Sequence, residues 1–312
     1  MTGNAPGAPP VSVWRAAATA LRRVLANALD FVRRVYEKAG EDNIFFLSGG
    51  IAFNIMVAAI PFLLLLVAGF GFILSWAVAD PARTTVDYVL HILPPSQAVK
   101  NVTYKLVNDI ISRRTRFGIL GVVLFAWTST RLFGTLRSVL QEIFDLQEDR
   151  SIIGGKLFDM QMVVVSGSLF LANTGITLAL EAVHAFGLRW LERAGWEELP
   201  AVQAAYARIL AFLFTYVMFL LMYRYLPARR TAWGVSVVAA TFTAVAWELL
   251  KGLFAWYVAH VANYANTYGA LAALVILVFW IYYSAMVFVL GGEVAQVWDL
   301  RRIRRRQREM LE

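Results

Sequence analysis

The chain contains a block of 36 residues, Ile44–Ala79, without one charged side chain. About 20 apolar residues suffice to cross the roughly 30 Å hydrocarbon core of a bilayer, and a straight helix of this block would be about 54 Å long. The block therefore predicts a membrane-spanning helix that is strongly tilted or bends near Gly49-Gly50 and Pro61. Composition agrees: 59% of the 312 residues are hydrophobic and 16% are charged, whereas soluble domains carry about 25% charged residues.

Further apolar blocks along the chain predict an all-α, polytopic membrane helix bundle of about six transmembrane helices, preceded by an amphipathic helix. The organisation expected is a disordered start and interfacial helix at 1–40, a transmembrane domain at 41–298 and a polybasic tail at 299–312. Residues 80–116 are polar and mixed, are interrupted by Pro81 and Pro94-Pro95, and predict a helical extramembrane insertion. The later spans are expected at Phe117 onward with the helix continuing to Phe144, at Met160–Leu180, at Ile209–Tyr223, near Thr231–Ala259 and at Gly269–Leu290.

The N-terminal segment has the pattern of a basic amphipathic helix. From Trp14 to Val35, apolar residues recur at steps of three and four, and the arginines lie mostly off that face. Such a helix either lies on the inner leaflet or packs on the protein's own cytoplasmic surface. Together with the tail it is expected to contact anionic lipid headgroups. The arginines expected to make these contacts are Arg22, Arg23, Arg33, Arg34, Arg301, Arg302, Arg304, Arg305 and Arg306.

The distribution of positive charge predicts the orientation. Of the 29 Lys and Arg residues, 19 fall in segments that are cytoplasmic if the N-terminus is inside, and nine fall in the outer loops. Because cytoplasmic loops carry an excess of Lys and Arg, this predicts a multi-pass protein of a bacterial inner membrane with both termini in the cytoplasm.

Ionisable residues within or beside the predicted spans are candidate site residues, because an intramembrane charge faces an interior, pairs or lines a path. Glu248 and Lys251 are spaced i, i+3 and share a helix face. They form either a structural ion pair or part of a polar cavity that meets a headgroup or an ion. Arg131 and Glu293 are either interfacial anchors at helix ends or members of the same polar path.

Asn54 is the remaining candidate, on a stripe of small and polar residues. Gly50, Asn54, Ala58 and Pro61 lie along one helix face, and such stripes usually face protein rather than lipid. Broken helices at membrane depth occur at transporter binding sites, whereas a simple proline kink has no such role. Both interpretations apply to Pro61.

Motifs for enzyme chemistry are missing from the sequence. His91, His184 and His260 stand far apart, and the chain has no cysteine, HxH, HxxxH, DxD, GxGxxG, Walker A or GxSxG sequence. We therefore predict no catalytic residues, no metal, no cofactor and no nucleic-acid partner. The expected partners are membrane lipids, and homo-oligomerisation is left open.

An ordered set of short motifs resembles the YihY/BrkB family of bacterial inner-membrane proteins over about residues 30–300. The motifs are Ala52–Leu66, Trp127–Arg131, Tyr223-Arg224-Tyr225-Leu226-Pro227, Trp233, Trp247-Glu248-Leu249-Leu250-Lys251, Tyr264–Gly269, Trp280-Ile281-Tyr282 and Gly291-Gly292-Glu293. Many relatives carry the label ribonuclease BN, and the resemblance also implies links to envelope integrity, serum resistance and lipopolysaccharide-precursor handling. Ribonuclease activity is not expected here, because clustered histidines and carboxylates are missing.

Two functions follow as hypotheses. The first is a transporter or flippase-like protein for an amphipathic, anionic envelope lipid or a related molecule, driven by an ion gradient or a partner ATPase. The alternative is a non-transporting membrane scaffold or envelope-assembly factor, and an ion or small-solute channel comes third. A laterally open cavity lined by Glu248, Lys251 and Arg131 would favour transport, and a closed bundle would favour the scaffold.

The topology yields a direct test. Reporter fusions at residue 195 and at residue 312 should report opposite sides of the membrane, because three predicted spans, an odd number, separate them. Fusions that report the same side would contradict six spans with cytoplasmic ends.

Overall fold

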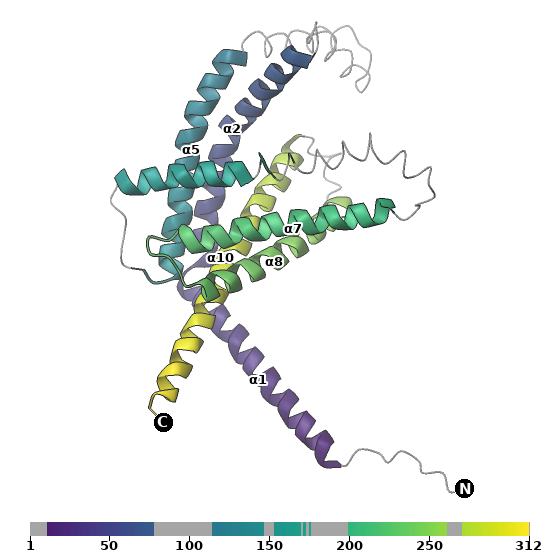
Figure 1. Ribbon diagram of the computed structural model, residues 1–312, viewed down its shortest axis with the longest axis vertical. Helices are drawn as coiled ribbons and strands as arrows, with labels where there is room; N and C mark the ends of the chain where they lie inside the picture. The colour runs from purple at the N-terminus through teal and green to yellow at the C-terminus, as the bar shows by residue number, and fades with distance from the viewer. Residues whose placement is uncertain are drawn as a thin grey trace, which may run out of the picture.

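The computed structural model describes residues 11–77, 114–146, 153–169, 171–172, 175, 199–260 and 270–311. Residues 153–169 form a helix that runs across α5 (Figure 1). The described residues contain no strand, which confirms the all-α fold class. The other helices are α1 (Val11–Glu41), α2 (Ile44–Ala77), α5 (Arg114–Ile143), α7 (Leu199–Tyr225), α8 (Trp233–His260) and α10 (Ala270–Glu309).

Five of these helices are long and apolar enough to cross a membrane, which confirms a polytopic helical membrane protein. Their candidate spans are Ile44–Leu66, Gly118–Ile143, Arg208–Tyr225, Trp233–His260 and Leu274–Glu309. Residues 1–10 and most of 80–116 lie outside the described residues. The predicted span at Met160–Leu180 is described only in part. Those three assignments stay predictions.

Helix α2 runs unbroken from Ile44 to Ala77 with Pro61 inside it. The stripe of small and polar residues faces protein, as predicted: Asn54, Ala58 and Pro61 are buried. The Asn54 Nδ2 donates to the Gly50 carbonyl at 2.9 Å, so the amide is bonded within its own helix. The stripe packs α2 against its neighbours without a break in the helix.

Glycines on α5 allow it to approach α2 closely. A Cβ at Gly121 would lie 3.1 Å from Leu65 Cδ2 and 3.3 Å from the Leu65 backbone nitrogen. Phe62 and Phe125 pack with their ring centroids 5.6 Å apart in the same interface. Small residues commonly permit such approaches between membrane helices.

Helix α10 is the central element, since it packs against α8, α2, α1 and α5. The sequence predicts a last span at Gly269–Leu290 and a polybasic tail at 299–312. One continuous helix covers most of both segments and runs through Gly291-Gly292 to Glu309. These glycines serve packing and do not end the helix, because a Cβ at Gly292 would lie 3.1 Å from Ile143 Cδ1.

A buried tyrosine joins α7, α8 and α10. Tyr223 is fully buried and stacks on Phe288 with centroids 4.9 Å apart. Its hydroxyl lies 2.7 Å from Thr243 Oγ1 on α8 and donates to the Phe288 carbonyl on α10. A Cβ at Gly291 would overlap Thr243 Oγ1 and lie 2.6 Å from the tyrosine hydroxyl. Only glycine leaves room for this network.

The aromatic residues that carried the family resemblance pack in the same region. Trp247 lies 5.5 Å from Trp280 and 6.0 Å from Phe219, between ring centroids. At the α7–α8 turn, the Arg224 guanidinium lies 4.9 Å from the Trp233 ring, a cation–π arrangement. These motif residues therefore contribute to helix packing.

Helix α1 and the last turns of α10 extend from the same end of the bundle (Figure 1). Arg301 lies 4.9 Å from the Phe31 ring and pairs with Asp30 at 2.6 Å, so α1 packs on α10 there. Assignment of this end to the cytoplasm stays a prediction. An outward apolar set on α1 remains exposed, comprising Leu25, Leu29, Val32 and Tyr36.

The tyrosine network predicts a sharp contrast between two glycines. Gly291→Ala should lower the thermal stability of the detergent-solubilised protein by the equivalent of about 1–3 kcal/mol, because it overpacks a filled contact. Gly252→Ala on α8 is the control, since nothing lies within 4 Å of its Cβ position, and it should not destabilise. Thermal unfolding followed by tryptophan fluorescence measures both, and equal behaviour of the two variants would contradict the packing role of Gly291.

Candidate binding groove

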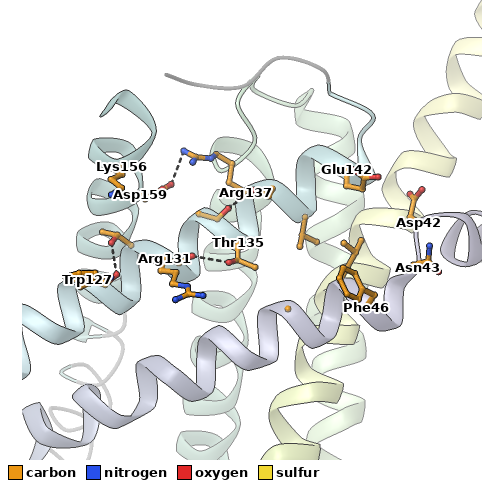
Figure 2. A pocket seen from close by; sticks show the side chains of 16 residues that line it. Asp42, Asn43, Phe46, Trp127, Arg131, Thr135, Arg137, Glu142, Lys156 and Asp159 are labelled. Atoms are coloured by element: carbon orange, nitrogen blue, oxygen red, sulfur yellow. Dashed lines mark hydrogen bonds and ion pairs between the residues drawn. The ribbon is translucent and has the colours of Figure 1, made fainter. Parts of the chain in front are cut away.

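A groove of about 1020 Å³ lies between the start of α2, the second half of α5 and the helix at 153–169 (Figure 2). Its α5 wall is one helical face, because the lining positions recur at steps of three and four. The lining residues are Asp42, Asn43, Phe46, Leu47, Gly50, Trp127, Thr130, Arg131, Gly134, Thr135, Arg137, Ser138, Val139, Glu142, Lys156 and Asp159.

Arg131 is a free positive charge in this groove. It lies within the candidate span Gly118–Ile143, and its side chain is exposed and points from α5 toward α2 (Figure 2). Among the described residues it has no ion-pair partner, and neither does Lys156, which also lines the groove. A charge at membrane depth costs about 2.5–3.5 kcal/mol on insertion scales. An arginine at this depth therefore faces an interior, a water-filled cavity or the membrane surface.

A second arginine is already paired. Arg137 Nη1 lies 3.2 Å from Asp159 Oδ1, and the side chains are 14% and 3% exposed. Two glycines make room for this pair, because a Cβ at Gly155 would lie 2.7 Å from Arg137 Nη1 and one at Gly134 would lie 3.5 Å from Asp159 Oδ2. The pair fixes the helix at 153–169 to α5 and so shapes the groove.

The end of the groove near the α1–α2 turn is acidic. Asn43 adopts a φ of 52°, a left-handed conformation that asparagine tolerates, and the turn places Asp42 at the groove. Lys38 Nζ donates to Asp42 Oδ1 at 2.9 Å. Partial burial lowers the pKa of Lys38, but the hydrogen bond to Asp42 and the nearby carboxylates outweigh this and hold that pKa above its ordinary value.

Glu293 lies behind this acidic end. It is fully buried, and the choice between an interfacial anchor and a member of a polar path stays a prediction. It comes from α10 and lies beside Asp42, since Gln296, one turn further along α10, binds Asp145, and Lys38 bridges Asp145 to Asp42. The sequence could not reveal this contact, because the two residues are far apart in the chain.

The Glu248–Lys251 pair is formed but lies elsewhere. The Lys251 Nζ is 2.7 Å from Glu248 Oε1, as the i, i+3 spacing predicted, and the side chains are 42% and 44% exposed. Neither residue lines the groove, and neither do Asn54, Pro61 or Gly49. Of the residues singled out from the sequence, the structure brings Arg131 and Gly50 together in the groove, and whether the others contact cargo stays untested.

Several groove residues were missed by the sequence analysis. Arg137 and Lys156 were counted only among the positive charges of a segment predicted to be cytoplasmic, and Asp159 was not singled out. A signal was present, because polar and small residues follow helical spacing along α5 from Thr130 to Ser138. The hydroxyls of Thr130 and Ser138 bond to the carbonyls of Trp127 and Gly134 at 2.8 and 3.1 Å, and so the backbone partly satisfies this polar face.

The basic residues expected to meet anionic lipid divide into two groups. Arg33, Arg34 and Arg301 form ion pairs with Glu37 and Asp30 at 2.6–2.9 Å, and such exposed pairs contribute about 0–1 kcal/mol and are readily exchanged. Arg302 lies 5.5 Å from the Trp298 ring. The residues with exposed side chains and no such partner among the described residues are Arg22, Arg23, Arg304, Arg305 and Arg306.

Comparison with known proteins agrees with the helical fold and the motif set. The family model described as Virulence factor BrkB matches residues 35–311. The chain belongs to the BrkB family. The chain is 27% identical to a UPF0761 membrane protein of Chlorobium phaeobacteroides over 81% of this chain and 53% of that protein. No solved structure matches the chain.

Other relatives carry the same printed description. A UPF0761 membrane protein of Janthinobacterium sp. is 24% identical over 79% of this chain and 54% of that protein. One of Alteromonas mediterranea is 23% identical over 82% of this chain and 83% of that protein. This BrkB-family chain spans little more than half the length of the first of these relatives. The names describe membrane proteins and assign no activity.

The groove carries two basic side chains, Arg131 and Lys156, without an ion-pair partner among the described residues. Within the described ranges, no group of three or more His, Asp or Glu residues could hold a metal ion. Arg131 and Lys156 instead offer unpaired donors, and guanidinium groups bind phosphate and carboxylate in a bidentate manner.

The two ion pairs should differ in strength. Arg137→Met should destabilise the protein by about 3–5 kcal/mol, because it leaves Asp159 charged and buried, and a double-mutant cycle with Asp159→Asn should show strong coupling. The same cycle at the half-exposed pair, Glu248→Gln with Lys251→Gln, should give about 1 kcal/mol or less. Unfolding in detergent measures both cycles, and similar coupling energies would contradict the buried role of Arg137.

Proposed function

We propose that this membrane protein binds and moves an amphipathic, anionic envelope lipid, with the headgroup entering the groove. The observation that carries the proposal is the unpaired Arg131 in a candidate membrane span, facing a cavity of about 1020 Å³. A phosphate or carboxylate headgroup supplies the counter-charge that Arg131 lacks among the described residues. Lys156, on the helix at 153–169, adds a second donor to the lining.

The shape of the groove supports an amphipathic ligand. Small-molecule sites have volumes of about 300–1,000 Å³, so a headgroup fits the groove. Phe46 and Trp127 line it and are 81% and 71% exposed. Large apolar surfaces therefore lie beside the charged and hydroxyl side chains of the groove. A lipid bound here keeps its acyl chains among these residues and the bilayer while its headgroup meets the charges.

The basic ends of the chain favour the same ligand class. Exposed arginines of α1 and α10 lie at the end of the bundle from which both helices extend (Figure 1). Juxtamembrane basic residues each attract anionic lipid by about 1 kcal/mol near the surface. In the predicted orientation they concentrate anionic lipid in the cytoplasmic leaflet, next to the acidic turn where the groove ends.

The proposal predicts the effect of removing the free charge. Arg131→Gln should reduce the scrambling of fluorescent phosphatidylglycerol in proteoliposomes about tenfold or more, since a hydrogen bond to a charged group contributes about 1.5–3 kcal/mol. Lys251→Gln is the charge-matched control on α8, outside the groove, and should scramble at the wild-type rate. The amount of inserted protein is measured in parallel.

Two adjacent glycines test the groove by volume. Gly50 lines the groove and its Cβ position has only the Thr135 methyl at 4.0 Å, whereas Gly49 does not line it and has nothing within 4 Å. Gly50→Trp should block scrambling, and Gly49→Trp should not. Absence of both lipid binding and scrambling in the wild-type protein would reject the proposal and leave the scaffold.

A further inference from the structure

Two carboxyl groups meet in the interior next to the groove. Glu293 is fully buried, and within the part of the chain that the structure describes neither of its carboxyl oxygens has a hydrogen-bond partner. Asp42 lies against α10 (Figure 2), beside the turn that carries Glu293, since Lys38 bridges Asp42 to Asp145 and Gln296 of that turn binds Asp145. Asp42 Oδ2 is likewise buried without a hydrogen bond. Unsatisfied buried polar atoms of this kind call for an explanation.

The surrounding charges do not neutralise the pair. From α1, Lys38 binds Asp42 Oδ1 at 2.9 Å and lies 3.6 Å from Asp145 Oδ2. Asp145, which follows α5, is also bound by Gln296 Nε2 at 2.7 Å. Helix α2 carries no charged residue, and Glu248 and Lys251 on α8 neutralise each other. Three carboxylates therefore face one ammonium group.

One proton resolves this arrangement. Two adjacent carboxylates with little solvent do not both stay ionised, because like charges at this separation repel strongly. A proton on Glu293 lets its hydroxyl donate to Asp42 Oδ2, which removes one negative charge and satisfies an oxygen on each side chain. Lys38 then balances the charge that remains on Asp42.

We propose that Asp42 and Glu293 together form a proton-binding site, and that proton binding there is coupled to binding of an anionic headgroup in the groove. The second half rests on the proposed function. Asp42 belongs to both sites, since it also lines the groove. A proton on the pair reduces the negative charge that a headgroup meets, so proton and anion bind cooperatively and each raises the affinity for the other.

The proton site is tested without any lipid. In an ester-free detergent, infrared difference spectra between acid and alkaline pH should show the carbonyl stretching band of a protonated carboxyl group that is lost on alkalinisation. Glu293→Gln should remove this band. Asp42→Asn should remove it too, because its amide donates to Glu293 and no proton is needed. Glu248→Gln is the matched control and should keep the band. A band unchanged in Glu293→Gln, or no such band in the wild type, would overturn the proton site.

The coupling is tested with short-chain phosphatidylglycerol, whose phosphate stays ionised across the neutral range. Wild-type affinity should fall as pH rises, by up to about tenfold per pH unit for one proton taken up. Glu293→Gln resembles the protonated pair and should bind with an affinity that does not change with pH. Persistent pH dependence in Glu293→Gln overturns the coupling. No binding at any pH rejects the proposed function and the coupling together, while the infrared result still decides the proton site.

Discussion

The rest of the structure depends on the position of α10, and one contact fixes that position. The Tyr223 hydroxyl bonds to Thr243 and to the Phe288 carbonyl, and Gly291 leaves room for this contact. Lipid chains are as apolar as leucine side chains, so membrane helices associate through close packing and interhelical hydrogen bonds. This contact supplies both at one point and holds α10 against α7 and α8. Helix α10 also packs on α1, α2 and α5. It therefore helps to position the helices that form the groove and the carboxyl pair.

The pairing of α2 with α5 changes character along its length. At Gly121 the helices touch so closely that a Cβ would meet the Leu65 backbone, while at Gly50 the nearest side chain is a Thr135 methyl group 4.0 Å away. The polar residues of α5 lie in this second, more open half. The α2–α5 pair is therefore tightly packed at one end and leaves space for a polar groove at the other. The Arg137–Asp159 ion pair holds the helix at 153–169, which forms the third side of the groove.

Intramembrane charge proved a useful guide to the site only in part. Glu248 and Lys251 were prominent in the sequence because both lie within one apolar block, and they neutralise each other on the outer side of α8. Arg131 was expected close to the end of its span, whereas it lies inside the candidate span Gly118–Ile143 and lines the groove. The two cases differ in their ion-pair partners. Glu248 and Lys251 pair within one helix and need no cavity, whereas an unpaired charge such as that of Arg131 needs water or a ligand.

The sequence by itself determined the membrane class, the helix positions, the buried stripe on α2 and the family, because apolar length and helical spacing are local properties of the chain. It also placed Glu248 within reach of Lys251, three residues away. Only the tertiary structure decided that Asp42 meets Glu293 and that Arg137 meets Asp159 across a pair of glycines. Those contacts join segments distant in sequence, and their partners are selected by how α10 and α5 pack, which no local pattern encodes.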